Sequence, residues 1–407
     1  MQYRINGRSG DELSVLGFGC MRLPERNGRI DRRRAESQIL SAIDRGVNYV
    51  DTAYPYHRGA AEPFLGSILT GRRKDLYLAT KLPPAAVHKR EDMSSVISNQ
   101  LNRLNTDYID YYMLHGINGI SWEKLRKLDV LAFLDGARAD GRIRQAGFSF
   151  HGDLSDFKAI IDAYDWDFCQ IQYNYLDEEN QAGTEGLEYA ASRAIPVFVM
   201  EPLRGGMLGG RMPERILAMI RDFHIQRSPA EWALRWILNR PEVNLVLSGM
   251  NVEEHLDENI EVSTNSPAGC MSRQELEFIS AVRDRFFEGL EIGCTGCRYC
   301  VPCPAEVDIP YCFEIYNRVK FFGEKKLFDN YFRYYHHLEY GVRSDGGHFA
   351  SRCTQCGRCV PKCPQGIDIP AKLTKVAGEM ETVLLRRVLV PFFSYFMKRA
   401  GRHASGN

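Results

Sequence analysis

The sequence lacks three features that assign many proteins to a broad class. Lysine and arginine together equal aspartate and glutamate at 52 residues each, so no excess of positive charge indicates nucleic-acid binding. No apolar run approaches the roughly 20 residues that span a bilayer, and the longest candidate, residues 388–397, has only ten uncharged residues. Residues 1–20 lack the basic and apolar regions of a signal peptide, and we therefore expect a cytoplasmic protein in which disulfides are rare.

Cysteine, in contrast, is concentrated near the C-terminus. Eight of the twelve cysteines form two runs, and a proline follows the last cysteine of each run. Thiolates at such short spacing can converge on one soft inorganic centre, whereas they cannot all pair as unstrained disulfides. The two runs are Cys294-x2-Cys297-x2-Cys300-x2-Cys303-Pro304 and Cys353-x2-Cys356-x2-Cys359-x3-Cys363-Pro364.

These runs resemble the bacterial ferredoxin pattern for [4Fe-4S] clusters. The second run matches the pattern in full, and the first is one residue short before its last cysteine. Zinc sites are the alternative, because four thiolates also suit Zn²⁺, but three successive x2 spacings ending in Cys-Pro are more typical of clusters. Each run continues to an Asp-Ile-Pro sequence that can start a helix, at residues 308–310 and 368–370. We therefore expect a small α-helical ferredoxin-like iron–sulfur domain over residues 291–375.

In the two-cluster ferredoxins, the fourth cysteine of each run ligates the cluster of the other run. Each of the two centres would then depend on both runs. The resemblance thus implies one [4Fe-4S] cluster held by Cys294, Cys297, Cys300 and Cys363, and a second held by Cys353, Cys356, Cys359 and Cys303.

The first 290 residues alternate short apolar runs with segments of helical periodicity. The helical segments include residues 33–44, 94–104, 122–139 and 229–238. Eight such strand–helix units favour an α/β fold, a (β/α)8 TIM barrel over residues 1–290, whose functional residues would lie at the C-terminal ends of the strands. The predicted strands are Val15–Phe18, Asn48–Asp51, Leu76–Thr80, Tyr108–Leu114, Arg144–Ser149, Phe168–Gln172, Pro196–Met200 and Asn244–Leu247.

Three consecutive predicted strands end in a characteristic set of polar residues. The second strand leads into the sequence Asp51-Thr-Ala-x-x-Tyr56, Lys81 follows the third strand and His115 follows the fourth. Here the chain resembles the aldo-keto reductase family, whose motif is Asp-(Thr or Ser)-Ala-x-x-Tyr with a strand-end Lys and a strand-end His. The resemblance extends over residues 3–259, and it implies that these four residues are catalytic.

The chemistry of these four residues can also be argued directly. Reduction of a carbonyl by hydride builds negative charge on its oxygen, which requires a proton donor. Tyr56 would be this acid, although a free tyrosine with a pKa near 10 is a poor donor at neutral pH. The ammonium of Lys81, held by Asp51, would lower the pKa of the phenol, and His115 would orient the carbonyl.

The resemblance further implies a nicotinamide cofactor, NAD(H) or NADP(H). Phe150 stands where many members carry Asn, and Met200 replaces the aromatic residue that usually stacks on the nicotinamide, although its sulfur can still cover a ring face. Glu253 and Glu254 would repel a 2'-phosphate and His255 replaces the usual Arg, so we expect NADH to bind at least as well as NADPH. The implied cofactor residues are Ser149, Gln170, Met200, Pro202, Leu203, Gly205, Gly206, Ser248, Gly249, Glu258 and Asn259.

The two predicted modules differ in the number of electrons they exchange, because a hydride carries two and a cluster transfers one at a time. A flavin or a substrate radical would normally connect them, and a flavin stays open although no Gly-x-Gly-x-x-Gly motif is present. The favoured reading is an oxidoreductase that reduces a small-molecule carbonyl or oxidises an alcohol, with two clusters exchanging electrons with ferredoxin or another carrier. In the alternatives the clusters are structural or redox-sensing, or the chain is a non-catalytic electron-transfer subunit.

Residues 376–407 have the composition of a basic amphipathic tail. From Lys372 onward, seven lysines and arginines accompany two acids and are interleaved with leucine and phenylalanine. The favoured reading is a C-terminal helix that packs its apolar face on the protein, and peripheral contact with an anionic membrane is the alternative.

Overall fold

The computed structural model describes residues 1–210, 212–322, 331, 334 and 348–382. The chain divides into two compact units, Met1–Gly210 with Ile225–Ser280 and Arg211–His224 with Ala281–Asn407. The first unit contains the barrel, and the second contains both cysteine runs. The domain boundaries predicted after residues 290 and 375 remain predictions.

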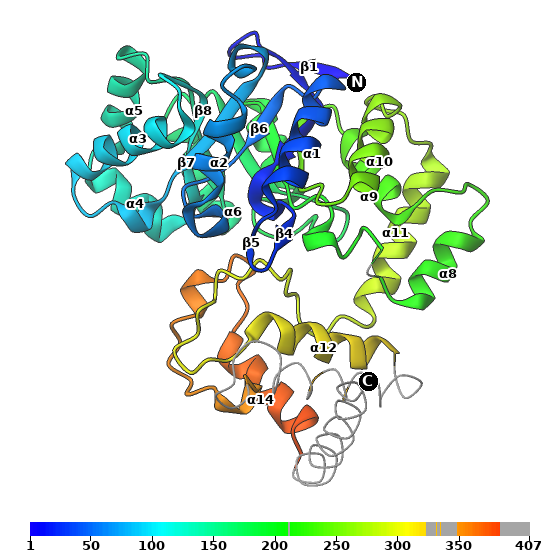
Figure 1. The fold of residues 1–407 in the computed structure, drawn as a ribbon. Helices are drawn as coiled ribbons and strands as arrows, with labels where there is room; N and C mark the ends of the chain where they lie inside the picture. The colour runs from blue at the N-terminus through cyan, green and yellow to red at the C-terminus, as the bar shows by residue number, and fades with distance from the viewer. Residues whose placement is uncertain (211, 323–330, 332–333, 335–347, 383–407) are drawn as a thin grey trace, which may run out of the picture. The chain divides into compact units, whose positions relative to one another are not determined.

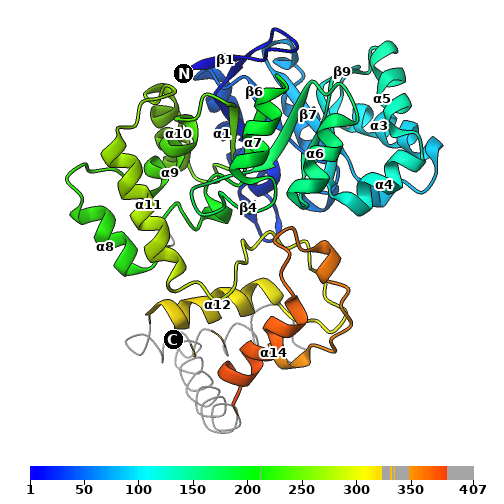
Figure 2. The same ribbon diagram turned by 180° about the vertical axis from the view of Figure 1, so that it is seen from behind.

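The first unit is built around a closed barrel of eight parallel strands (Figures 1 and 2). Each barrel strand pairs with the next one along the chain, and the last pairs with the first. Every predicted strand is present within a few residues of its predicted bounds, so the (β/α)8 fold is confirmed. The strands are β3 (Leu16–Gly19), β6 (Tyr49–Asp51), β7 (Tyr77–Leu82), β8 (Ile109–Ile117), β9 (Ile143–Phe150), β10 (Phe168–Gln172), β11 (Val197–Met200) and β12 (Val243–Ser248).

Helices lie around the barrel in both views (Figures 1 and 2). The single helix predicted over residues 122–139 is wrong, because Asp129 adopts a left-handed backbone with φ of 57° and separates two helices. The helices of this unit are α1 (Arg32–Asp44), α2 (Ala61–Ile68), α3 (Arg90–Leu104), α4 (Gly119–Lys127), α5 (Val130–Ala139), α6 (Leu154–Asp162), α7 (Gly183–Ser192), α9 (Pro229–Leu238) and α10 (Glu253–Thr264).

Aromatic side chains fill the interior of the barrel. Tyr49 and Tyr111 meet edge to face with ring centroids 5.2 Å apart, and Phe168 stacks on Phe198 at 5.0 Å. All four side chains are fully buried. Because the interior is packed in this way, a binding site is expected at the C-terminal ends of the strands rather than along the barrel axis.

The sequence analysis did not predict the antiparallel hairpin that precedes the barrel. Leu13 of this hairpin belongs to the same buried cluster as the aromatic side chains. The hydroxyl of Tyr111 donates a hydrogen bond to Asp11 at 2.6 Å, which ties the hairpin turn to the barrel. The hairpin consists of β1 (Tyr3–Ile5) and β2 (Glu12–Ser14), and a second short hairpin consists of β4 (Glu25–Arg26) and β5 (Arg29–Ile30).

The second unit is helical, with no strand among residues 281–322 and 348–382. Its two central helices each begin directly after the aspartate of an Asp-Ile-Pro sequence, as predicted. Asp368 accepts a hydrogen bond from the backbone N–H of Ala371 at 3.2 Å, and Asp308 accepts one from Tyr311 at 3.4 Å. Its helices include α8 (Glu214–Asp222), the end of α11 (Arg273–Phe287), α12 (Ile309–Phe322) and α14 (Ile369–Met380).

Helix α14 continues past residue 375, where the sequence predicts the tail to begin. Val376 and Met380 are buried in the core that α12 and α14 share, so this part of the tail packs on the protein. The rest of the predicted tail, residues 383–407, lies outside the described residues. Within the described part of the chain, no helix has the length and the apolar composition needed to cross a bilayer.

Candidate functional site

Lys81 and Asp51 form a buried ion pair at the C-terminal end of the barrel. Asp51 is the last residue of β6, and Lys81 lies on the neighbouring strand β7. The Lys81 Nζ donates to Asp51 Oδ1 at 2.6 Å and to the carbonyl oxygen of Thr52 at 2.7 Å. The lysine side chain is 1% exposed and the aspartate 4%. Burial lowers the pKa of Lys81 and raises that of Asp51, and the attraction between the two charges opposes both shifts.

Tyr56 and His115 lie next to this ion pair. A 3-10 turn over Tyr56–Gly59 places the Tyr56 ring centroid 5.0 Å from Lys81 Nζ. The rings of Tyr56 and His115 meet edge to face with their centroids 6.0 Å apart. Strand β8 extends to Ile117, so His115 lies inside the strand and not after it. The structure therefore brings the four predicted catalytic residues together.

The turn that carries Tyr56 has an unusual backbone. His57 and Arg58 have φ values of 50° and 58°, a left-handed conformation that costs about 1–2 kcal/mol for each non-glycine residue. The His57 ring is held on both sides, because Nε2 accepts from the backbone N–H of Leu23 at 3.2 Å and Nδ1 lies 2.8 Å from Glu25. Strain that is held in place by its surroundings in this way is typical of functional sites.

The imidazole of His115 is neutral at neutral pH. Burial, followed by the positive charge of Lys81 and by the neighbouring His151, holds the pKa of His115 well below its usual 6.5. Burial likewise lowers the pKa of His151 to about 4. A neutral imidazole has one ring N–H to donate, so His115 can hydrogen-bond to a carbonyl oxygen without adding charge to the site.

The residues predicted to hold the nicotinamide lie on three adjacent strands. Ser149 on β9 is the register neighbour of Gln170 on β10, and Met200 ends β11. The Ser149 Oγ accepts from the backbone N–H of Gly116 at 2.8 Å, and the Gln170 amide nitrogen lies 3.4 Å from Met200 Sδ. The buried Oε1 of Gln170 has no hydrogen-bond partner within the described part of the chain. This oxygen could accept a hydrogen bond from a ligand amide, so the residues present fit a nicotinamide.

The residues predicted for the adenosine end lie on β12, on the adjoining Gly249 and on α10. Asn259 donates to Ser248 Oγ at 2.8 Å, which ties α10 to the end of β12. Glu258 accepts a hydrogen bond from Ser228, at the start of α9. The side chains of these three predicted contacts thus already have protein partners, and the structure holds them in fixed positions.

The acids of α10 are not all available to repel a phosphate, contrary to the sequence argument. Glu253 pairs with Arg34 of α1, with 2.9 Å between Arg34 Nε and Glu253 Oε1, and Asp257 pairs with Arg45. The hydrogen bond from Arg34 lowers the pKa of Glu253 to about 2. Glu254 is exposed and has no such partner among the described residues. Repulsion of a 2'-phosphate therefore rests mainly on Glu254.

The loop after β11 contains Pro202, Leu203, Gly205 and Gly206, all predicted to contact the nucleotide. Gly205 and Gly206 have φ values of 67° and 88°, in the region that glycine adopts without strain. Glu201, at the start of the loop, also has a positive φ of 56° although it carries a side chain. The loop is thus folded back tightly beside the strand end.

Two charged residues of this loop, Glu201 and Arg204, were not among the cofactor-binding residues predicted from the sequence. Glu201 lies 3.7 Å from Arg22, and Arg204 lies 3.3 Å from Asp177. Burial raises the pKa of Glu201. The side chains of Arg204 and Asp177 are 5% and 3% exposed, and Nε and Nη1 of Arg204 have no partner in the described structure. Glu201 and Arg204 follow directly after a predicted barrel strand, and this position could have marked them as candidate site residues.

The second unit contains two cavities that are each lined by one predicted set of four cysteines. The first cavity is lined by Cys294, Cys297, Cys300 and Cys363, and the second cavity by Cys303, Cys353, Cys356 and Cys359, with Cys300 at its edge.

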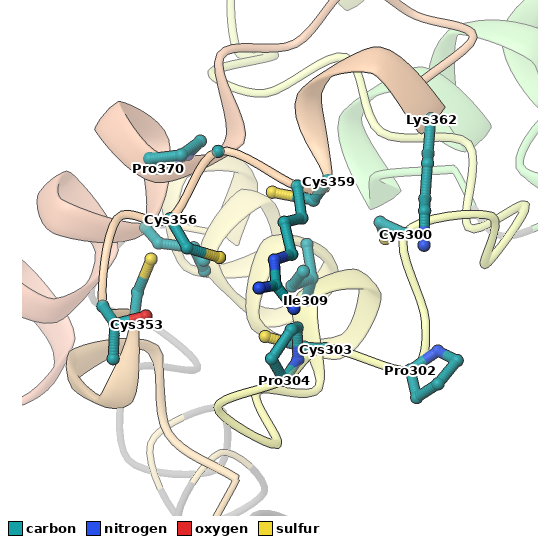
Figure 3. A pocket seen from close by; sticks show the side chains of 14 residues that line it. Cys300, Pro302, Cys303, Pro304, Ile309, Cys353, Cys356, Cys359, Lys362 and Pro370 are labelled. Carbon is teal, nitrogen blue, oxygen red and sulfur yellow. The ribbon is translucent and has the colours of Figure 1, made fainter.

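Figure 3 shows the second cavity, in which the Cys303 sulfur lies among those of Cys353, Cys356 and Cys359. Each run therefore contributes its fourth cysteine to the cavity of the other run. Soft thiolate ligands in this grouping suit iron–sulfur clusters. Among the residues that the structure describes, no group of three or more His, Cys, Asp and Glu is arranged to hold a single metal ion.

Two family models match the chain in its two parts. The model described as the aldo/keto reductase family matches residues 15–268, and a 4Fe-4S dicluster domain model matches residues 293–367. The chain therefore belongs to the aldo/keto reductase family and carries a 4Fe-4S domain C-terminal to the barrel. It is an oxidoreductase, and the family predicted from the sequence is confirmed.

Several characterised proteins are similar to this chain over about two thirds of its length. Methylglyoxal reductase YeaE of Escherichia coli (strain K12) is 27% identical over 274 residues, and the match covers 64% of this chain and 90% of that protein. The NADH-specific methylglyoxal reductase of the same organism is 24% identical and covers 62% and 91%. Among solved structures, the holo form of aldo-keto reductase AKR11C1 from Bacillus halodurans has 26% identity and a TM-score of 0.59, covering 69% and 96%.

Proposed function

We propose that the barrel reduces a small carbonyl compound, or oxidises the corresponding alcohol, with a nicotinamide nucleotide. The observation that carries the proposal is the buried Lys81–Asp51 pair, whose ammonium lies 5.0 Å from the Tyr56 ring centroid. His115 completes the group from the next strand. A nicotinamide supplies or accepts hydride when it is bound, and Gln170 and Ser149 are the residues that would hold its amide.

Tyr56 holds the proton that a developing alkoxide receives. The ammonium of Lys81 stabilises the phenolate that remains after proton transfer, because a nearby positive charge favours the anion. Asp51 and the Thr52 carbonyl keep the ammonium in place, and their burial excludes water from it. His115, as a neutral donor, orients the carbonyl oxygen towards Tyr56.

We also propose that the second unit holds two [4Fe-4S] clusters in crossed ligation. Such clusters accept and donate single electrons when they are bound. The proposed exchange partner is ferredoxin or another one-electron carrier. The support is the grouping of the cysteines into two cavities, each with three ligands from one run and one from the other. The ligands are Cys294, Cys297, Cys300 and Cys363 for the first cavity, and Cys353, Cys356, Cys359 and Cys303 for the second.

The substrate that we propose to assay first is methylglyoxal. Two relatives, at 27% and 24% identity, are named as methylglyoxal reductases, and one of them is named as NADH-specific. A small aldehyde also makes few contacts with the variable loops that give such barrels their specificity. Both NADH and NADPH should be supplied in the assay.

Tyr56→Phe separates the chemistry of the barrel from that of the cysteine cavities. The variant should lower carbonyl reduction by about 10²–10⁴, the usual contribution of a general acid. Nucleotide affinity, iron content and reduction of the clusters by an external donor should stay unchanged, because the thiolate ligands belong to the other unit. Tyr54→Phe, in the same loop with its ring against Arg103, is the matched control and should keep wild-type activity.

Retention of every two-electron activity in Tyr56→Phe would contradict this assignment. The four residues would then be a remnant of the family site, and the chain would act as an electron-transfer subunit. Loss of activity in both Tyr56→Phe and Tyr54→Phe would instead indicate damage to the loop.

A further inference from the structure

The two cysteine cavities differ in their exposure to solvent. In the first cavity Cys300 is buried, and the other three cysteines are half-buried. In the second cavity Cys356 is exposed, and it is the one exposed cysteine among the eight. Its neighbours Gln355 and Arg358 are exposed as well. A group held in the second cavity therefore lies closer to solvent than one held in the first.

The cavities also differ in charge. The charged residues that line the second cavity are Arg358 and Lys362, both exposed, and neither has an acidic partner among the described residues. The charged residue that lines the first cavity is Arg298, which lies 3.7 Å from Asp308. Arg358 and Lys362 therefore carry positive charges beside the second cavity that pair with no described acid.

Two exposed apolar residues lie between these two cations in the sequence. Val360 is 39% exposed, and Pro361 beside it is also exposed. Both belong to the 3-10 turn Val360–Lys362, which begins directly after the cavity residue Cys359. Small apolar centres with charged rims are typical of protein interfaces, and those of redox partners are at the small end of the size range.

We propose that this docking surface, formed by Cys356, Arg358, Val360, Pro361 and Lys362, receives an acidic one-electron carrier protein of the ferredoxin type. The inference rests on the proposed function, because it requires a cluster in the second cavity. The charge of the surface attracts an acidic partner and rejects a basic one.

Electron transfer at this surface changes no bond and moves no proton. One electron would pass from the reduced carrier, which is oxidised, to a [4Fe-4S] cluster held by Cys303, Cys353, Cys356 and Cys359, which would be reduced by that one electron. Close approach is available there because Cys356 is exposed, whereas the first cavity offers no exposed cysteine. The direction can reverse when the carrier is the oxidised partner.

The first test uses the full chain, purified anaerobically with its clusters. Stopped-flow absorbance follows the reduction of the clusters by reduced ferredoxin at ionic strengths from about 0.02 to about 0.5 M. The second-order rate constant should fall about tenfold or more over this range, because salt screens the attraction between the carrier and the docking surface. A rate constant that does not depend on salt overturns the proposal without any variant.

The second test removes the two cations with Arg358→Gln and Lys362→Gln in one chain. The rate with ferredoxin at low salt should fall about tenfold or more, and most of its salt dependence should be lost. Iron content and the rate with reduced methyl viologen, a small cation, should not fall. Arg358→Lys with Lys362→Arg keeps the charge and should keep the wild-type rate.

Arg298→Gln is the matched control, because it removes a cation beside the first cavity. It should leave the rate with ferredoxin within about twofold of the wild type, since Arg298 is not part of the docking surface and its charge is already paired with Asp308. If it slows the reaction as much as the double variant, docking at the second cavity is wrong. If the double variant shifts only a reduction potential, the cations merely balance the charge of the cluster, and the proposal is again wrong. An iron count before the kinetics separates these outcomes from failure of the proposed function, in which no clusters are present.

Discussion

Lys81 and Asp51 show at the scale of single residues why the candidate active site is sensitive to substitution. Withdrawing two ions from water costs several kcal/mol per ion before their attraction is counted. The 2.6 Å contact and the Thr52 carbonyl offset much of that cost. Such a pair adds little net stability, but loss of one partner leaves a buried charge uncompensated. The arrangement therefore suits a site in which a charge must be held in a fixed position.

Lys81→Met should lower both activity and stability. Carbonyl reduction should fall by about 10²–10⁴, because the phenol of Tyr56 loses the neighbouring positive charge. The free energy of unfolding should fall by about 3–5 kcal/mol, because Asp51 is left buried without its partner. The double variant Lys81→Met with Asp51→Asn should recover stability but not activity in paired denaturation and turnover measurements. Recovery of both would mean that Lys81 serves the fold alone.

The stability of Lys81→Met should also depend on pH in a defined direction. Without the ammonium, burial raises the pKa of Asp51 further above its unfolded value of about 3.9. The folded chain then binds a proton that the unfolded chain releases, so the free energy of unfolding falls as pH rises above about 4. Urea denaturation at several pH values checks this trend. A variant that grows more stable with rising pH, relative to the wild type, contradicts it.

His115 should not titrate in the working pH range. Its pKa is held well below its usual value, first by burial and then by Lys81 and His151, so the ring stays neutral at neutral pH. The pH profile of kcat/KM should therefore show no change caused by titration of His115. A limb near pH 6.5 that is present in the wild type and absent in His115→Gln would show the opposite.

At the scale of elements, helices α1 and α10 determine how the nucleotide end of the barrel is charged. Arg34 of α1 pairs with Glu253 of α10, and Arg45, which directly follows α1, pairs with Asp257 of α10. These pairs neutralise two of the neighbouring acids in this part of the sequence. Neutral pairs between adjacent helices do not repel a phosphate. The remaining unpaired acid at the start of α10 is Glu254 in the described structure.

Glu254→Gln should improve the binding of NADPH relative to NADH. The wild type should bind NADPH no more tightly than NADH, and a tenfold preference for NADPH, about 1.4 kcal/mol, would contradict this. Removing the acid should favour the 2'-phosphate by about 0.3–1 kcal/mol, the usual effect of one charge near a helix N-terminus. Isothermal calorimetry with both nucleotides measures the difference. Glu261→Gln, an exposed acid later in α10, is the control and should change neither affinity.

At the scale of the whole molecule, the chain combines a barrel with a repeated cysteine unit. The two Asp-Ile-Pro sequences start α12 and α14, which share one core, so the two copies of the unit fold together. Each cavity is then lined by cysteines from both copies. The second unit therefore should not keep one cluster when one of the copies is removed.

Cys363→Ser tests the crossed ligation in the full chain. The wild type should contain about eight irons, as two [4Fe-4S] clusters require. The variant should lose or convert the cluster of Cys294, Cys297 and Cys300, while the cluster of the second run stays largely intact by electron paramagnetic resonance and iron analysis. Cys270→Ser, outside both cavities, is the control. Damage confined to the second cluster would show local ligation, and about two zinc ions per chain would exclude clusters altogether.

The strands, the four candidate catalytic residues and the cysteine sets could be predicted because local chemistry marks them. Short apolar runs in strict alternation with helical segments allow few folds other than a barrel, and strand ends then identify Asp51, Lys81 and His115. Likewise, the spacing and Cys-Pro endings of the two runs reflect the demands of the metal centre and do not depend on the rest of the chain. The sequence by itself therefore determined the fold class, the family and the identity of the candidate residues.

Only the tertiary structure decided which charges neutralise one another. Arg34 meets Glu253 across 219 positions of the chain, and Arg204 meets Asp177 from a different barrel loop. The left-handed backbone of Asp129, which divides a predicted helix, also lacks a local signal because aspartate adopts this conformation only in certain surroundings. Pairing, burial and exposure arise from contacts between distant segments, and no pattern of neighbouring residues specifies them. The exposure of Cys356, on which the proposed docking surface depends, is also decided by the tertiary structure.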